Sequence, residues 1–163
     1  MMNAIQTEGL TKFYGRSRGI IDLDMEVHEG EFYGFIGPNG AGKSTTIRIL
    51  MGLIHKTRGS ARIFGKDISK EKEQILSVTG YLPSEAVFYP DMRGRDLIRL
   101  SAGLRRKDCR KASADLCERL QLDPSRRISE LSFGNRKKLA VVCACSMIRC
   151  FVFWMNQQVD WIP

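Results

Sequence analysis

The sequence has 163 residues, of which 43% are hydrophobic, 27% charged and 9% aromatic. That balance is typical of a globular domain and excludes a disordered tail, a collagen-like repeat and a small disulfide scaffold. Lysine and arginine outnumber aspartate and glutamate by 26 to 18, which gives a net charge of +8. A basic chain suits nucleic acid, an anionic membrane surface or a phosphate ligand, and a solvated basic face is the plain alternative.

The apolar stretches and the cysteines predict a protein of the cytoplasm. The longest apolar stretch, residues 139–148, includes Ser146 and ends at Arg149. A membrane-spanning helix needs roughly 20 apolar residues, so we expect none. No basic-then-apolar start precedes Thr7, so we expect no cleavable signal. The five cysteines have no framework spacing, which suits a reducing compartment.

The first part of the chain predicts strands around a glycine-rich loop. One strand is indicated by apolar residues that alternate with polar ones and so form one buried face: Ile21, Leu23, Met25 and Val27. Residues 31–36 are apolar at nearly every position and predict a short strand buried on both faces. A glycine-rich loop follows at residues 37–42, and residues 43–51 predict a helix.

Further along, residues 60–64 and 77–82 predict two more strands. The pattern turns helical from Asp91 to Leu120, which suggests a helical subdomain inserted into an α/β core. Residues 135–148 predict a third helix. Two stripes at helical spacing are predicted to face the core: Leu97, Leu100 and Leu104 on one helix, and Cys109, Ala112, Leu116 and Leu120 on the other.

The glycine-rich loop matches the phosphate-binding pattern G-x-x-x-x-G-K-[ST]. The matching residues are Gly37, Pro38, Asn39, Gly40, Ala41, Gly42, Lys43, Ser44 and Thr45. Glycines allow positive φ angles and bring backbone N–H groups close to a triphosphate, and the helix that follows directs its positive dipole end at the phosphates. We expect Lys43 to neutralise the β- and γ-phosphates and Ser44 to offer its hydroxyl to Mg²⁺. The motif alone does not separate a transporter ATPase from a small-molecule kinase or a GTPase.

A second string narrows the family. The residues Leu131, Ser132, Phe133, Gly134 and Asn135 lie beyond the helical insert. The string resembles the L-S-G-G-Q signature of the ATP-binding cassette (ABC) ATPases. Residues 11–15, the pair Gly30-Glu31 and the phosphate-binding loop resemble the opening of the same domains, so the resemblance covers residues 4–144.

The resemblance implies an α/β fold: a P-loop core with an N-terminal antiparallel β subdomain and an inserted α-helical subdomain, the C-terminal part of the core being missing. The parts expected are residues 1–86 for the β subdomain and P-loop core, 87–130 for the helical subdomain, 131–148 for the signature and its helix, and 149–163 for an out-of-frame tail.

The resemblance also implies roles. Tyr14 is similar to the aromatic residue that stacks on adenine, and Ser132 and Gly134 to signature residues that reach the γ-phosphate of ATP held by a partner subunit. ATP and Mg²⁺ are the implied ligands. The implied partners are a second ABC subunit, head to tail, and a membrane permease, with the chain peripheral at the inner face of the membrane and no nucleic acid involved. The alternatives are an ABC-type ATPase acting on DNA or ribosomes, and a non-functional fragment.

The chain departs from the family pattern in places. Phe133 replaces the first signature glycine, Asn135 the glutamine, and Ser84 stands at the position of the glutamine that senses Mg²⁺ and the attacking water. These departures resemble those of exporter-type bacterial ABC ATPases. A Phe133 ring either crowds the partner's phosphate or makes an apolar contact within its own subunit.

The chain has no Asp-Glu pair after Leu139, where the family places the carboxylates that order Mg²⁺ and polarise water. The genetic code offers a reason. In the reading frame that starts at the third base of the Phe153 codon, the single codons of Trp154 and Met155 force the residues Leu-Asp-Glu. The codons that follow permit Pro-Thr-Ser-Gly-Leu-Asp-Pro, as the family has it. The hypothesis is a frameshift between about residues 144 and 147, and it predicts negligible hydrolysis by this chain.

Overall fold

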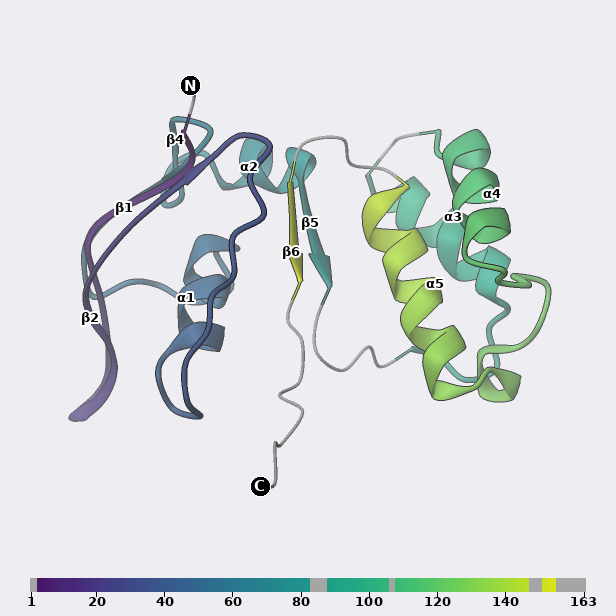
Figure 1. The fold of residues 1–163 in the computed structure, drawn as a ribbon, viewed down its shortest axis with the longest axis horizontal. Helices are drawn as coiled ribbons and strands as arrows, with labels where there is room; N and C mark the ends of the chain where they lie inside the picture. The colour runs from purple at the N-terminus through teal and green to yellow at the C-terminus, as the bar shows by residue number, and fades with distance from the viewer. Residues whose placement is uncertain (1–2, 83–87, 106–107, 147–150, 155–163) are drawn as a thin grey trace. The chain divides into compact units, whose positions relative to one another are not determined.

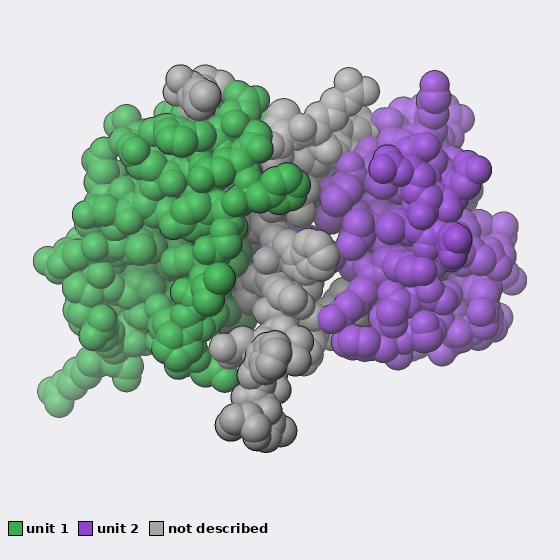
Figure 2. Space-filling view, viewed as in Figure 1, with its two compact units in different colours: residues 1–78 green, residues 79–163 purple. Residues whose placement is uncertain are grey.

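The computed structural model describes residues 3–82, 88–105, 108–146 and 151–154. The chain divides into two compact units, residues 1–78 and residues 79–163 (Figure 2). None of the helices in these ranges has the length and apolar character required to span a bilayer.

The first unit is built on a four-stranded sheet that is antiparallel throughout (Figure 1). Its strands lie in the order β2-β1-β3-β4. They are β1 (Asn3–Tyr14), β2 (Ser17–His28), β3 (Arg58–Ile63) and β4 (Lys66–Asp67). The predicted N-terminal antiparallel sheet is therefore confirmed.

The alternation predicted along β2 holds for only half of the strand. Met25 and Val27 are buried, whereas Ile21 is exposed and Ile20 is buried in its place. Asp22 lies between the two halves with a φ of 47°, and the pairing of β2 with β1 is irregular beside it. This bulge moves the buried side by one residue.

Residues 31–36 do not form the predicted strand. They run as a coil between β2 and α1 (Figure 1), and Phe32 and Ile36 are fully exposed. The reason is pairing: a strand apolar on both faces needs neighbouring strands, and no strand in the described part of the chain pairs with these residues.

Two helices complete the first unit, α1 (Lys43–Leu50) and α2 (Lys72–Val78). α1 confirms the helix predicted after the loop, with Ile49 and Leu50 buried. α2 was not predicted, and it takes the first two residues of the strand predicted at 77–82, because Lys72, Glu73 and Gln74 are good helix formers.

In the part of the second unit that the structure describes, a pair of parallel strands is combined with three α-helices. Its elements are β5 (Thr79–Leu82), α3 (Gly94–Leu104), α4 (Arg110–Arg119), the 3-10 turn η1 (Ile128–Glu130), α5 (Phe133–Cys145) and β6 (Phe151–Trp154). The helical region predicted from Asp91 to Leu120 is thus two helices. The third helix is confirmed, although the last residues predicted for it, Met147 and Ile148, lie outside the described residues.

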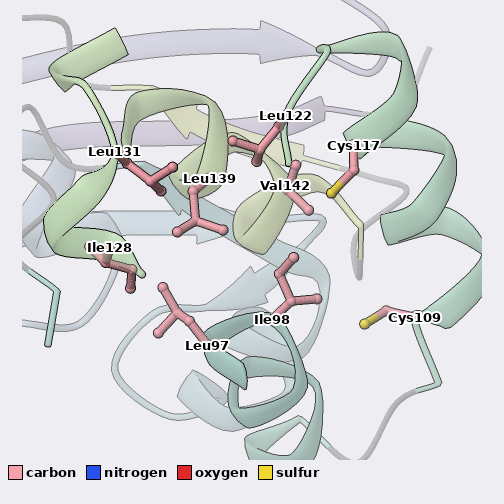
Figure 3. Packing of buried hydrophobic residues seen from close by; sticks show 9 residues of the cluster. All are labelled: Leu97, Ile98, Cys109, Cys117, Leu122, Ile128, Leu131, Leu139 and Val142. Carbon is pink, nitrogen blue, oxygen red and sulfur yellow. The ribbon is translucent and has the colours of Figure 1, made fainter. Parts of the chain in front are cut away.

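The core of this unit lies between α3, α4 and α5 (Figure 3). Its buried members are Leu97, Ile98, Cys109, Cys117, Leu122, Ile128, Leu131, Leu139 and Val142. The predicted stripes were wrong in part, because Leu100, Leu104 and Ala112 are exposed. Each helix carries two overlapping apolar stripes, and packing around α5 selects the one through Ile98 and the one through Cys117.

Candidate nucleotide-binding site

The phosphate-binding loop leads directly into α1, as the motif requires. The Ala41 amide closes a turn by donating to the Pro38 carbonyl at 3.1 Å. The Thr46 amide and hydroxyl both donate to the Gly42 carbonyl, at 2.8 and 3.0 Å. The amides of residues 43–45 precede this first helical bond and have no intrahelical acceptor, so they form a group of donors suited to an anion.

Two of the three loop glycines have the positive φ that was predicted. Gly40 has a φ of 84° and Gly42 a φ of 88°, whereas Gly37 has no positive φ. A Cβ atom on Gly42 would lie 2.2 Å from Ile20 Cγ2 and 3.0 Å from the Gly19 carbonyl oxygen. Gly42 therefore lets the start of α1 lie directly against β2, which fixes the loop on the sheet.

The side chain of Lys43 lies along the inside of the loop. Its ammonium donates to the Gly37 carbonyl and, at 2.8 Å, to the Pro38 carbonyl. Both acceptors belong to the loop itself, so the positive charge is held among the backbone groups that would surround a phosphate.

Tyr14 lies beside the start of the helix, although 31 residues separate it from Thr45 in sequence. Its hydroxyl is 3.5 Å from Thr45 Oγ1, and the Lys12 ammonium is 5.2 Å from the centre of its ring. The ring is about half exposed. The strand therefore presents an accessible aromatic face next to the phosphate-binding loop, and stacking of this ring on adenine stays a prediction.

The other loop residues are accessible to a ligand. Pro38, Asn39 and Ala41 are exposed, and Ser44 and Thr45 are half-buried. Contact with Mg²⁺ is predicted for the hydroxyl of Ser44, which is the second residue of α1 and directly follows Lys43. Within the described residues, no group of three or more histidine, cysteine or acidic side chains could hold a metal ion.

The signature residues lie at the start of α5, in the second unit. Ser132 is the N-cap of this helix, and its hydroxyl accepts a hydrogen bond from the Asn135 amide at 3.2 Å. Leu131, just before it, is buried in the helical core. The buried leucine and the capping serine together fix where the helix begins, and the amides of its first turn point outward from that end.

Among the described residues, Phe133 does not pack into the helical core, so the predicted apolar contact within its own subunit is not seen there. Its ring is mostly exposed and lies under the Lys137 ammonium, 4.6 Å from the ring centre. A Cβ atom on Gly134 would meet only the Ser132 hydroxyl, at 4.0 Å, so this glycine leaves the helix end open. Ser84, the predicted counterpart of the family's glutamine, lies outside the described residues.

Sequence reasoning missed three residues that shape the loop. Gly19 and Ile20 form the surface on which Gly42 rests, and Lys12 lies over the ring of Tyr14. The spacing of two between Lys12 and Tyr14 places both on one side of a strand and was a usable signal. No pattern in the sequence indicated that Ile20 would meet Gly42, because the bulge at Asp22 sets which side of β2 faces the loop.

Comparison with known proteins gives relatives that are named as ATP-binding proteins of transport or drug resistance. The chain is 34% identical over 147 residues, 88% of its length and 48% of the other protein, to the bacitracin transport ATP-binding protein BcrA of Bacillus licheniformis. It is 48% identical over 84 residues, 50% of its length and 26% of the other protein, to the daunorubicin/doxorubicin resistance ATP-binding protein DrrA of Streptomyces peucetius.

Solved structures give the same result. An ATP-binding subunit of an ABC transporter matches with a TM-score of 0.79 and 28% identity, over 88% of this chain and 62% of that one. The chain spans about half the length of the curated relatives that it matches over most of its own length. The model of the family described as "ABC transporter" matches residues 20–154. With most of its residues matched by that model, the chain belongs to the ABC transporter family.

Proposed function

We propose that the chain binds ATP with Mg²⁺ as part of the ATP-binding subunit of an ABC transporter. The arrangement of Gly42, Lys43 and Thr46 carries the proposal: a loop fixed on the sheet, a cation held inside it and a helix start with free amides. Lys43 binds the β- and γ-phosphates, Ser44 contacts Mg²⁺, and Tyr14 stacks on adenine. A loop of this form supplies most of its donors from the backbone, as a triphosphate requires.

The proposed partners are a second cassette and a membrane permease. Ser132 and Gly134 lie at an open helix end, where they would meet the γ-phosphate of ATP on the second subunit. The direction of transport is proposed to be export. Relatives named for drug resistance and for Nod factor export support that direction. The chain would then act at the inner face of the membrane.

We further propose that the sequence after about residue 147 is read out of frame. The Asp-Glu pair that the shifted frame encodes would supply the carboxylates that this chain lacks after Leu139. The test is the nucleotide sequence across codons 140–163 and beyond. A shifted frame that stays open and later encodes a histidine supports the frameshift, and an early stop in that frame contradicts it.

Nucleotide binding is tested by calorimetry. The chain, shown to be folded by circular dichroism, is titrated with Mg-ATP beside the Lys43→Ala variant. We expect heat of binding from the chain and a loss of at least about tenfold in affinity from the variant, because the loop loses its only ammonium. Absence of heat from the folded chain would contradict the proposal.

A further inference from the structure

A groove of about 480 Å³ lies between α3 and α4 of the second unit. It is named here the α3–α4 groove, and its wall includes the apolar side chains of Ile98, Ala102, Cys109, Ala114 and Cys117. Figure 3 shows Ile98 on α3, with Cys109 and Cys117 on the side of α4. The volume is in the range of small-molecule sites, so the groove has room for a ligand.

Two polar side chains of the wall are satisfied or uncharged without a ligand. The buried Ser113 hydroxyl donates a hydrogen bond to the Arg110 carbonyl at 3.1 Å. Burial raises the pKa of the Cys117 thiol, so this side chain stays neutral at pH 7. A wall of this kind favours an apolar occupant, because water gains few hydrogen bonds from it.

The rim of the groove on the α3 side is basic. Arg95 and Arg99 are one helical turn apart and both line the groove. Their guanidinium groups lie 4.0 and 3.7 Å from the carboxylate of Asp96. Two guanidinium groups beside one carboxylate leave one positive charge in excess. Arginine binds carboxylates through paired N–H donors, so this rim is suited to an anionic head group.

The rim on the α4 side is electrically neutral. Arg110 lies 2.8 Å from the carboxylate of Asp108, and both residues line the groove. The hydrogen bond from Arg110 lowers the pKa of Asp108 to about 2, so the carboxylate is ionised at pH 7 and matches the charge of its partner. The excess positive charge is therefore confined to the α3 side.

We propose that the α3–α4 groove binds a free fatty acid. The alkyl chain lies along the apolar wall beside Ile98 and Cys117, and the carboxylate meets Arg95 and Arg99. A molecule with one anionic end and an apolar tail is complementary to an apolar wall with excess positive charge at one rim. The site lies within the second unit, so it does not depend on nucleotide binding.

The test is calorimetric titration of the whole chain with octanoate, decanoate and dodecanoate, each below its micellar concentration. A methylene group that is fully removed from water strengthens binding by about fourfold. Because part of the wall is exposed, burial of the alkyl chain is incomplete, and we expect a gain of at least about fivefold for each two carbons. One fatty acid should bind per chain.

The role of the arginines is tested with decanol, which has the same chain length as decanoate and no charge. We expect decanol to bind at least about tenfold more weakly, because it lacks the charged hydrogen bonds. The variant with Arg95→Gln and Arg99→Gln together should bind decanoate as weakly as decanol and should bind decanol as the unmodified chain does.

A pair of variants locates the groove. Ala114→Phe places a ring in the groove at an exposed position of α4 and should abolish decanoate binding, while circular dichroism shows the chain still folded. The matched control is Ala112→Phe, at an exposed position of the same helix that does not line the groove, and it should bind decanoate as before.

Four outcomes would overturn the proposal: affinity that does not change with chain length, equal affinity for decanol and decanoate, equal decanoate binding by Ala114→Phe and Ala112→Phe, or binding to phosphatidylglycerol vesicles without binding of monomeric decanoate. The last outcome would assign the basic rim to a membrane surface. Titration with Mg-ATP is a separate measurement, so failure of nucleotide binding is distinguishable from failure of fatty-acid binding.

Discussion

At the scale of single residues, the loop depends on a hydrogen atom at Gly42. The Cα of this residue lies so close to β2 that a methyl group has no room, while Gly40 has the same type of φ with nothing within 4 Å. The two glycines thus separate two effects: Gly40 needs a left-handed backbone, and Gly42 needs both that backbone and the absence of a side chain.

Substitution of these glycines should have unequal effects. Gly40→Ala adds only the strain of a left-handed alanine, so we expect a loss of about 1 kcal/mol in the free energy of unfolding. Gly42→Ala adds contact with Ile20, and we expect a loss of about 3 kcal/mol. Urea unfolding followed by circular dichroism measures both. Equal losses would show that the close packing on β2 is not decisive.

The cap of α5 gives a second residue-scale prediction. Ser132→Ala removes the acceptor for the Asn135 amide and should lower the free energy of unfolding by about 1 kcal/mol. Ser132→Asp keeps an acceptor and should stay within a few tenths of a kcal/mol of the unmodified chain. Urea unfolding of the two variants side by side is the measurement. An aspartate as damaging as the alanine would contradict a capping role.

At the scale of elements, the helical core holds a thiol in an environment that opposes its ionisation. Cys143 packs against the buried cluster between α3, α4 and α5. Burial away from water raises the pKa of Cys143 to about 11, from an ordinary value of 9.0. The thiol therefore stays neutral in the folded chain at pH values where the unfolded chain would already lose the proton.

This shift predicts a loss of stability at alkaline pH. The contribution is fully present below pH 9 and is lost as the pH rises toward 11, because the unfolded chain releases the proton first. The expected loss in the free energy of unfolding across this range is up to about 3 kcal/mol. Cys143→Ala should lack this part of the decline in urea unfolding at pH 8, 9 and 10. Parallel declines in the two proteins would contradict the assignment.

The sequence predicted the elements that depend on local pattern and missed those that depend on distant partners. The loop, α1 and α5 follow from glycines, helix formers and a capping serine that lie next to one another in the chain. The strand predicted at residues 31–36 is not formed, because its run of apolar residues suits a strand that has neighbouring strands on both edges. The stripe through Leu100 failed because helical spacing alone did not show which side would meet α5.

The candidate site divides in the same way. The motif identified Lys43 and Ser44, and the family resemblance identified Tyr14, which the structure then places 3.5 Å from Thr45. Neither the motif nor the resemblance could identify Ile20 as the surface under Gly42, because the bulge at Asp22 depends on hydrogen bonds between strands. Thr11 Oγ1 accepts one of these bonds from the Asp22 amide at 3.0 Å.

At the scale of the whole molecule, binding and turnover should separate. The loop for phosphate is formed, but no Asp-Glu pair follows Leu139 in this sequence. We therefore expect phosphate release from Mg-ATP at the level of the Lys43→Ala variant, because no carboxylate pair orders the metal ion and activates water. A colorimetric assay of the phosphate that the chain and the Lys43→Ala variant release from Mg-ATP checks this expectation. Turnover well above that of the variant would contradict the expectation.

The ammonium of Lys43 already has two carbonyl partners inside the loop. Under the proposed function, an incoming nucleotide must displace these two carbonyls from the ammonium, so its affinity reflects an exchange of oxygen ligands. Doubly charged terminal phosphates compete well with amide carbonyls for such a cation. A nucleoside monophosphate, whose single phosphate must both fill the amide cradle and displace two carbonyls, is at a disadvantage. The proposed site should therefore bind a nucleoside triphosphate more tightly than a nucleoside monophosphate, because the Lys43 ammonium is already hydrogen-bonded to the loop.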